Sequence, residues 1–181
     1  GKTEIAALLI EHLSSHAPVE LIDSSKIRKT PIGATLGFSR GDRESNVRRH
    51  ALAAKLLNQN GVIAVVSAVS PYRDIRTAIR NEFEQFAEVY VSTPVEDCIN
   101  RDTTGTYARA IAGDIPNYTG ISAPYEPPNT PEIQVNASNQ GVSECVQAIL
   151  TFLHNEGWVS PKTQVRGDSE TDTIASSLRL L

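Results

Sequence analysis

Methionine is absent from all 181 residues, and cysteine and tryptophan are scarce, with two and one respectively. The two cysteines, Cys98 and Cys145, have no metal-ligand spacing, so a disulfide-rich scaffold and a zinc site are excluded. No stretch approaches the roughly 18 apolar residues that cross a bilayer. No charged-then-apolar leader precedes a cleavage site. We therefore expect an unexported protein of the reducing cytoplasm that has no membrane partner.

The absence of methionine also removes any initiator residue, because the chain opens directly on Gly1-Lys2-Thr3. We expect the natural protein to be longer at its front. We also expect the chain as given to fold poorly and to bind nucleotides weakly.

The composition is that of an ordinary globular domain, with 40% hydrophobic and 21% charged residues. The net charge of -4 argues against a nucleic-acid partner. The cations are nevertheless unusual, since 12 are Arg and 5 are Lys, and ten of the Arg lie between Arg28 and Arg109. Guanidinium groups suit phosphate and sulfate oxygens, so this concentration favours a small polyanionic ligand, with solvated helix faces as the alternative.

Hydrophobic periodicity alternates between helical and strand-like along most of the chain. The strongest strand signal is Val62–Val66, whose continuous apolar run indicates burial on both faces of a parallel sheet. We therefore expect an α/β fold in which helices cover a parallel sheet and ligands bind at the carboxyl ends of the strands. The predicted helices are 2–14, 44–59, 72–84, 94–102 and 141–155, and the predicted strands are 19–23, 62–66, 88–92 and 133–136.

Two segments interrupt or follow this alternation. Residues 103–131 are rich in proline and lack apolar periodicity, which is more typical of a functional lid than of a packing element. Residues 159–181 turn to Ser, Thr, Asp and Lys, which predicts a polar tail or linker. We expect a single domain over residues 1–158.

Gly1-Lys2-Thr3 at the start of a helix matches the back end of the phosphate loop, Gly-x-x-x-x-Gly-Lys-Ser/Thr. In such a loop the backbone N–H groups cradle phosphates, the lysine reaches the β and γ oxygens, and the hydroxyl binds magnesium. The tripeptide alone is weak support, since the preceding strand and the first glycine are not in this sequence.

Further blocks follow at the places where a ligand would bind. They are Leu36-Gly37-Phe38-Ser39, Asp42-Arg43 and Asn46-Val47-Arg48-Arg49 around one helix start, then Ser70-Pro71-Tyr72-Arg73 after the buried strand, and lastly Tyr118-Thr119-Gly120-Ile121 and Pro124-Tyr125-Glu126-Pro127-Pro128. In this order the blocks resemble those of the adenylylsulfate kinase family, over residues 1 to about 158. The resemblance implies a three-layer P-loop kinase fold with a lid insertion, whose front strand and most of whose phosphate loop are absent from the given chain.

The resemblance also implies an activity and its partners. Family members transfer the γ-phosphate of ATP to the ribose 3'-hydroxyl of adenylyl sulfate, with Mg2+ as cofactor, giving 3'-phosphoadenylyl sulfate and ADP in sulfate assimilation. ATP and adenylyl sulfate would be the small-molecule partners. A homodimer is implied too, and a fused or associated ATP sulfurylase is a further partner to consider.

Site residues carry over by their positions in the matching blocks. The resemblance places ATP on Gly1, Lys2, Thr3, Arg101 and Arg109, and Mg2+ on Thr3 and Asp23. It places adenylyl sulfate on Arg28, Phe38, Arg43, Asn46, Ser70 and Tyr118. The catalytic roles fall to Asp23, Ser70 and Lys2. For Phe38 and Tyr118 the plain alternative is ordinary packing, and for Ser70 it is a helix cap.

Three departures from the family pattern leave alternatives open. Ser25 stands where the family has the carboxylate usually proposed as the base, and loss of a general base typically slows turnover about 100- to 10,000-fold. Thr104 and Ile111 replace two lid cations. The alternative hypotheses are therefore a catalytically weak or silent module that senses adenylyl sulfate or its phosphorylated product, and a P-loop kinase for another small alcohol or nucleoside.

Overall fold

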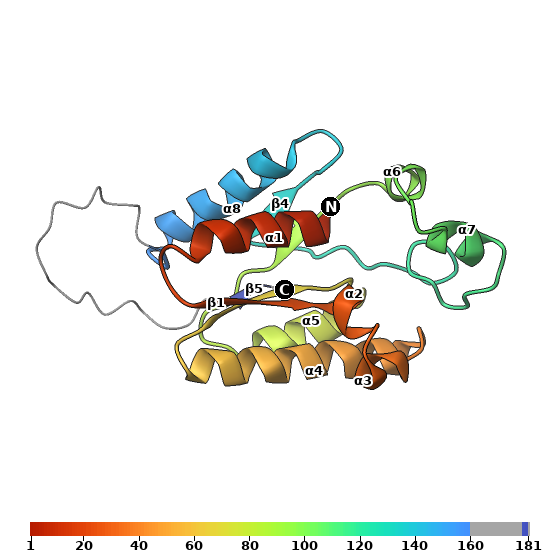
Figure 1. Cartoon of the computed structure of the whole chain (residues 1–181), viewed down its shortest axis with the longest axis horizontal. Coiled ribbons are helices and arrows are strands. Elements are labelled where there is room, and N and C mark those ends of the chain that lie inside the picture. Colours follow the sequence, from red (N-terminus) through yellow and green to blue (C-terminus); the bar gives the residue numbers. More distant parts are fainter. Residues whose placement is uncertain (160–178, 181) are drawn as a thin grey trace, which may run out of the picture.

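A computed structural model describes residues 1–159 and 179–180 of the chain. Helices and strands alternate along it as the sequence predicts (Figure 1). The strands are β1 (Val19–Asp23), β2 (Ile63–Ser67), β3 (Val89–Val91), β4 (Ile133–Val135) and β5 (Arg179–Leu180). The helices are α1 (Lys2–Leu13), α2 (Ser24–Ile27), α3 (Pro31–Ala34), α4 (Arg40–Gln59), α5 (Arg73–Arg80), α6 (Val95–Asn100), α7 (Thr106–Ile111) and α8 (Val142–Asn155).

All strand pairs in the described residues are parallel, and they form two hydrogen-bonded groups, β1-β2-β5 and β3-β4. In the first group Val19 pairs with Ile63 and Asp23 pairs with Ser67. This register brings the carboxyl ends of β1 and β2 to the same edge. The residues that follow these two strands therefore lie side by side.

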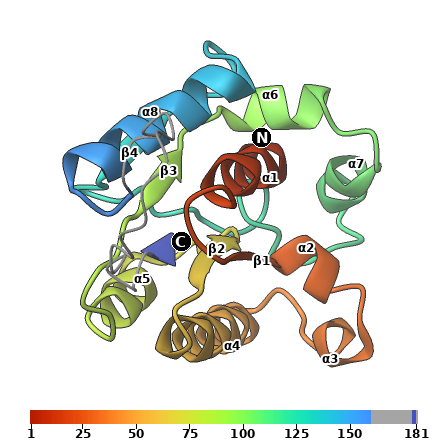
Figure 2. The ribbon, with the colours of Figure 1, turned by 60° about the vertical axis from the view of Figure 1, so that its left-hand side comes forward.

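Helices cover the strands on both faces, with α1 and α8 on one side and α4 and α5 on the other (Figures 1 and 2). The reason is visible in β2, whose five residues are all buried. Ile63 and Val65 belong to the cluster formed with α1 and α8, whereas Ala64 and Val66 pack with Ala54 of α4. Alternate side chains of β2 thus pack into two hydrophobic cores, one on each face of the sheet. The predicted α/β class is confirmed.

Several elements differ in extent from the prediction. The helix predicted from residue 44 begins at Arg40, because Ser39 and Asp42 form a capping box ahead of the apolar pattern. The helix predicted over 72–84 ends at Arg80. The short helices α2, α3 and α7 were not predicted, since four to six residues are too few to show a period.

The predicted tail over 159–181 lies for most of its length outside the described residues. Of its described part, Val159 is buried against the cluster of α1 and α8, and β5 pairs in parallel with β2. Among the described residues, no helix is long and apolar enough to cross a membrane.

Candidate active site

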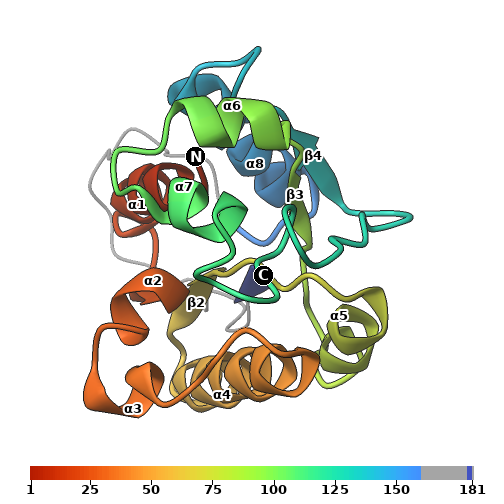
Figure 3. The same cartoon turned by 90° about the vertical axis from the view of Figure 1, so that its right-hand side faces the viewer.

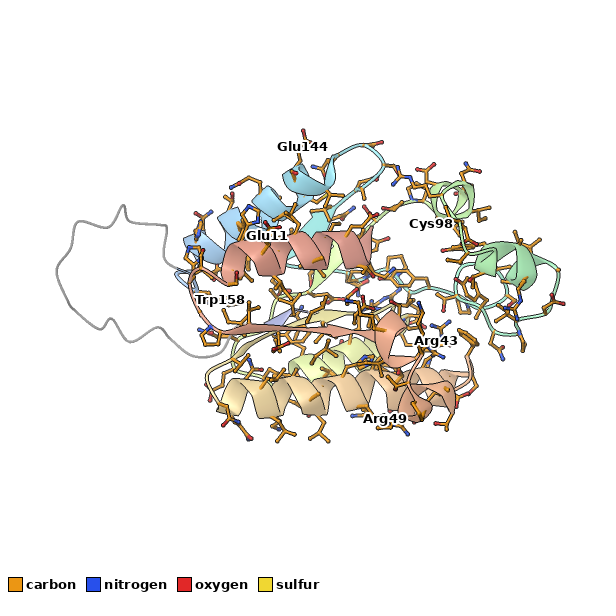
Figure 4. All side chains as sticks on the ribbon, in the orientation of Figure 1. Glu11, Arg43, Arg49, Cys98, Glu144 and Trp158 are labelled. Carbon is orange, nitrogen blue, oxygen red and sulfur yellow. The ribbon has the colours of Figure 1, made fainter. Side chains whose placement is uncertain are left out.

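Several of the predicted site residues lie at the carboxyl ends of β1 and β2: Asp23 ends β1, Asn46 bonds Ser24 just after it, and Ser70 follows β2. There the start of α1 lies near α2, α6 and α7, which surround it when the molecule is viewed from this end (Figure 3). Figure 4 shows Arg43 and Cys98 toward this end and Trp158 toward the opposite one.

Asp23, the last residue of β1, is 3% exposed. Its Oδ1 accepts hydrogen bonds from the backbone N–H of Ser25 at 2.7 Å and from the Ser25 hydroxyl at 2.6 Å. Burial acts to raise the pKa of Asp23, but hydrogen bonding by Ser25, Lys26 and the nearby Thr3 hydroxyl outweighs it and lowers the pKa below its ordinary value. Asp23 is therefore a carboxylate at neutral pH, and its buried Oδ2 has no hydrogen-bond partner in the described structure.

The start of α1 faces this carboxylate. Gly1 is the N-cap of the helix, and its carbonyl accepts from the N–H of Ile5 at 2.9 Å. Lys2 is an exposed residue, but desolvation by the protein around its ammonium lowers its pKa, while the charges of Cys98 and Asp23 act to raise it. The helix start thus presents N–H groups, one cation and the Thr3 hydroxyl beside Asp23.

This pair of oxygen groups fits a hard cation. The orphaned Oδ2 of Asp23 and the Thr3 hydroxyl are the kind of ligands that Mg2+ takes, alongside substrate phosphates and water. Within residues 1–159 and 179–180, no three His, Cys, Asp or Glu side chains gather into a metal site of their own. A cation here would depend on a phosphate ligand for the rest of its shell.

A second part of the site is built around the Phe38 ring. The guanidinium of Arg28 lies 4.6 Å from the ring centroid and that of Arg43 lies 5.0 Å from it. Arg28 is held there by donating to the carbonyls of Leu36 at 2.9 Å and Gly37 at 3.1 Å. Two cations on one aromatic ring form a surface suited to a base that carries anionic groups.

Tyr118 reaches the same ring from the Pro-rich segment. Its centroid is 5.9 Å from that of Phe38, and Tyr107 of α7 meets it edge-on at 5.2 Å. Burial raises the pKa of Tyr118, and the charge of Asp102 adds to this, so its phenol is neutral near pH 7. The structure therefore brings Phe38 and Tyr118 together from segments about 80 residues apart.

Asn46 and His50 lie one turn apart on the buried face of α4. Asn46 is 5% exposed and donates from Nδ2 to the Ser24 hydroxyl at 2.9 Å, which ties α4 to the end of β1. His50 is 2% exposed, and neither ring nitrogen has a hydrogen-bond partner in the described structure. Burial lowers the pKa of His50 to about 4, with the Arg28 charge acting in the same direction and Asp23 against it.

Ser70 follows β2 with a φ of 38°, in the left-handed region that residues other than glycine rarely adopt. Such a backbone costs about 1–3 kcal/mol and persists only where the surroundings hold it. The residue is 7% exposed, and its Oγ makes no hydrogen bond in the described structure. A strained serine with a free hydroxyl beside the carboxyl end of β2 is in the position expected of a substrate contact.

Arg101 and Arg109 are the two cations of the predicted lid. Arg101 donates to the carbonyl of Ala137 at 3.1 Å, and Arg109 is exposed in the last turn of α7. Neither makes a bond to Lys2 or Asp23 in the described structure. Of the residues that depart from the family pattern, Thr104 hydrogen-bonds Asp102 and Ile111 is 59% exposed.

Three residues of this region were missed or left without a role in the sequence. Tyr107 was passed over because α7 has no apolar period. His50 was given no role, and the structure buries it one turn from Asn46 on α4. Arg76 was counted only among the ten clustered Arg, and its contacts depend on segments distant in sequence.

A helix that begins with Gly-Lys-Thr beside the carboxyl end of a parallel strand is the arrangement by which P-loop kinases hold nucleotide phosphates. The fold and the site define a protein of that class. Within it, residues 1–136 match the model of the adenylylsulphate kinase family, and the chain belongs to this family.

Individual relatives agree with this membership. The chain is 41% identical over 160 residues to an adenylyl-sulfate kinase of Synechococcus sp. (strain JA-3-3Ab), covering 88% of this chain and 90% of that protein. It is 43% identical over 159 residues to a probable adenylyl-sulfate kinase of Pseudomonas aeruginosa, covering 87% and 73% of the two chains. The structure is similar, with a TM-score of 0.78 and 33% identity, to the APS kinase of Mycobacterium tuberculosis in complex with AMPPNP and APS, over 85% of this chain and 91% of that one.

Proposed function

We propose that this protein transfers the γ-phosphate of ATP to the ribose 3'-hydroxyl of adenylyl sulfate, giving 3'-phosphoadenylyl sulfate and ADP in sulfate assimilation. One observation supports the proposal: the Gly1-Lys2-Thr3 start of α1 and the buried Asp23 lie at the same end of the fold as a ring, Phe38, flanked by two guanidinium groups. The helix start is suited to nucleotide phosphates, and the ring with its guanidinium groups is suited to an adenine that carries anionic groups.

The residues divide the work between the two substrates. Gly1, Lys2 and Thr3 bind the ATP phosphates, and Arg101 and Arg109 approach them when the lid closes. Arg28, Arg43 and Asn46 contact the phosphosulfate and ribose of adenylyl sulfate. Its adenine stacks between Phe38 and Tyr118 after these two rings, whose centroids lie 5.9 Å apart at an angle of 52°, separate to admit it. Base stacking of this kind is worth roughly 1–3 kcal/mol per base.

Asp23 is the group that receives the acceptor proton. A P–O bond to the 3'-oxygen forms while the bond to ADP breaks, and the proton of the hydroxyl must leave. Oδ1 is taken up by Ser25, so Oδ2 is the oxygen left for this task. Positioning and charge neutralisation carry most of phosphoryl transfer, which makes a single buried carboxylate sufficient.

Thr3 and Asp23 would hold Mg2+ together with the ATP phosphates. Bound there, the ion would neutralise charge on the transferred phosphoryl group. Because the orphaned Oδ2 of Asp23 is the proton acceptor in this proposal, Asp23 would hold the ion through one of its water ligands rather than through that oxygen.

Single-turnover transfer of labelled γ-phosphate from ATP to adenylyl sulfate tests the function. The full-length natural protein is compared with its Ser25→Asp variant, which restores the carboxylate of the family pattern, and with Ser25→Ala as the matched control. We expect transfer by the parent protein, a faster rate by about 10-fold or more in Ser25→Asp, and no gain in Ser25→Ala.

Transfer seen only in Ser25→Asp, with adenylyl sulfate bound equally by all three proteins, would contradict the proposal and make the protein a sensor. Transfer to another nucleoside but not to adenylyl sulfate would contradict it in favour of a different P-loop kinase.

Partners beyond the two substrates are proposed on the family resemblance. A homodimer is expected, and sedimentation velocity at micromolar concentration checks it. Association with ATP sulfurylase is checked by co-elution with that enzyme. We place the protein in the cytoplasm, where fractionation should recover it.

A further inference from the structure

A buried arginine with no assigned role joins two parts of the site. Arg76 of α5 is 4% exposed. Its Nη1 donates to the carbonyl of Ser70 at 2.7 Å, and its Nη2 donates to the carbonyl of Glu126 at 2.7 Å. One guanidinium thus bridges the strained turn after β2 and the Pro-rich segment that carries Tyr118.

The bridge is fixed by further contacts on both sides. Arg76 Nε pairs with Glu88 Oε1 at 2.6 Å, and both side chains are almost fully buried. From the other segment, the N–H of Glu126 donates to the carbonyl of Pro71 at 2.9 Å. Because a buried charge is tolerated only when paired, the Glu88 carboxylate balances the charge of the guanidinium at this place.

Ser70 needs such support from outside its own turn. It is one of two non-glycine residues with positive φ in the described chain, and its neighbour Pro71 has no N–H to offer. The carbonyl of Ser70 is held by Arg76. A lysine could keep the charge toward Glu88, but it lacks the planar fork that reaches two carbonyls at once.

We propose that Arg76 is a positioning residue for phosphate transfer. It holds Ser70 in the strained geometry that presents its hydroxyl to the site, and it anchors the adjoining Pro-rich segment. The inference rests on the proposed function, in which Ser70 lies beside the acceptor.

The test compares Arg76→Lys with Arg80→Lys by steady-state kinetics. Arg80 lies one turn further along α5 and pairs with Glu88 and Glu132, but it makes no bond to Ser70 or Glu126 in the described structure. Since a misplacement of about 1 Å can cost 100-fold, we expect kcat to fall roughly 10- to 100-fold in Arg76→Lys with KM for ATP changed less than about 2-fold. Arg80→Lys should change kcat less than about 3-fold.

A double-mutant cycle with Ser70→Ala asks whether Arg76 acts through Ser70. In that background Arg76→Lys should lower kcat by less than about 3-fold, because the hydroxyl that it positions is gone. Thermal melts check the folding of each variant. If Arg76→Lys does not fold, Glu88→Gln loosens the same guanidinium and should lower kcat with KM for ATP unchanged.

Equal losses in Arg76→Lys and Arg80→Lys, a loss confined to KM, or additive effects with Ser70→Ala would overturn the inference and leave Arg76 a structural residue. Unchanged kcat in an active protein would overturn it while the proposed function stands. Inactivity of the parent protein would overturn both.

Discussion

The Phe38 ring, with two guanidinium groups and Tyr118 close around it, gives a direct test of ligand stacking. Phe38→Ala should weaken adenylyl sulfate binding about 5- to 150-fold, since stacking is worth roughly 1–3 kcal/mol. Tyr118→Phe is the matched control and should change affinity less than about 5-fold, because its ring remains. Titration calorimetry measures both, and equal losses would argue against adenine lying between the two rings.

His50 makes stability depend on pH. Its pKa is about 4 in the fold, against 6.5 ordinarily, so between these values the unfolded chain binds more protons and the fold loses stability as pH falls. At about 1.4 kcal/mol per unit the loss amounts to about 3 kcal/mol. Urea unfolding from pH 7 to 4.5 should show this decline in the parent protein and a shallower one in His50→Leu.

The control for this measurement is His12→Asn, an exposed position on α1. It should keep the parent slope. A His50→Leu protein as sensitive to pH as the parent would mean that other groups cause the decline.

At the residue scale, the sequence indicates which side chains can carry chemistry, but it does not indicate what surrounds each of them in the fold. Asp23, Phe38 and Ser70 could be selected because each belongs to a block with a recognisable pattern. His50 and Arg76 could not, because their properties come from burial and from backbone carbonyls that approach from remote segments. The sequence likewise does not indicate that the Ser25 hydroxyl bonds Asp23.

Among the elements, α4 carries much of the site, and its first turn depends on a capping box. The Ser39 hydroxyl accepts from the N–H of Asp42, and the Asp42 carboxylate accepts in return from Ser39. Ser39→Ala should therefore lower the free energy of unfolding by about 0.5–2 kcal/mol. Because the turn leads into Arg43, binding of adenylyl sulfate should weaken as well.

Chemical denaturation and calorimetry check this prediction. Ser143→Ala, on the exposed surface of α8, is the matched control and should leave stability within about 0.5 kcal/mol of the parent. A Ser39→Ala protein as stable as this control would show that packing of the apolar face alone sets the start of α4.

Long elements were predictable and short ones were not. The apolar periods of α1, α4 and α8 and the run in β2 exceed what local chance produces, and each was placed within a few residues of its ends. Helices α2, α3 and α7 owe their existence to caps and tertiary contacts. Asp23 accepts from the N–H of Ser25, and Thr30 accepts from that of Gly33, at helix starts that the hydrophobic pattern does not mark.

At the scale of the whole molecule, the alternation of helices and strands in the sequence predicted the α/β class, but it did not predict which strands pair with one another. The strands form two groups, with β5 added beside β2, and no local pattern predicts that pairing. The site itself takes Phe38 from the region between α3 and α4, and Tyr107 and Tyr118 from the Pro-rich segment. It is therefore complete only when both regions are folded.

We expect the same convergence to make Cys98 a reporter of nucleotide occupancy. It is partly exposed and lies near both Tyr107 and Lys2, whereas Cys145 is completely buried. A thiol reagent should label one cysteine rapidly in the native protein, and ATP should slow that reaction by covering the Lys2 side of the site. Stopped-flow absorbance follows the rate, with Cys98→Ser lacking the fast phase. A rate indifferent to ATP would mean that nucleotide binds away from this thiol, whereas a slowed one would let occupancy be read without a radioactive label.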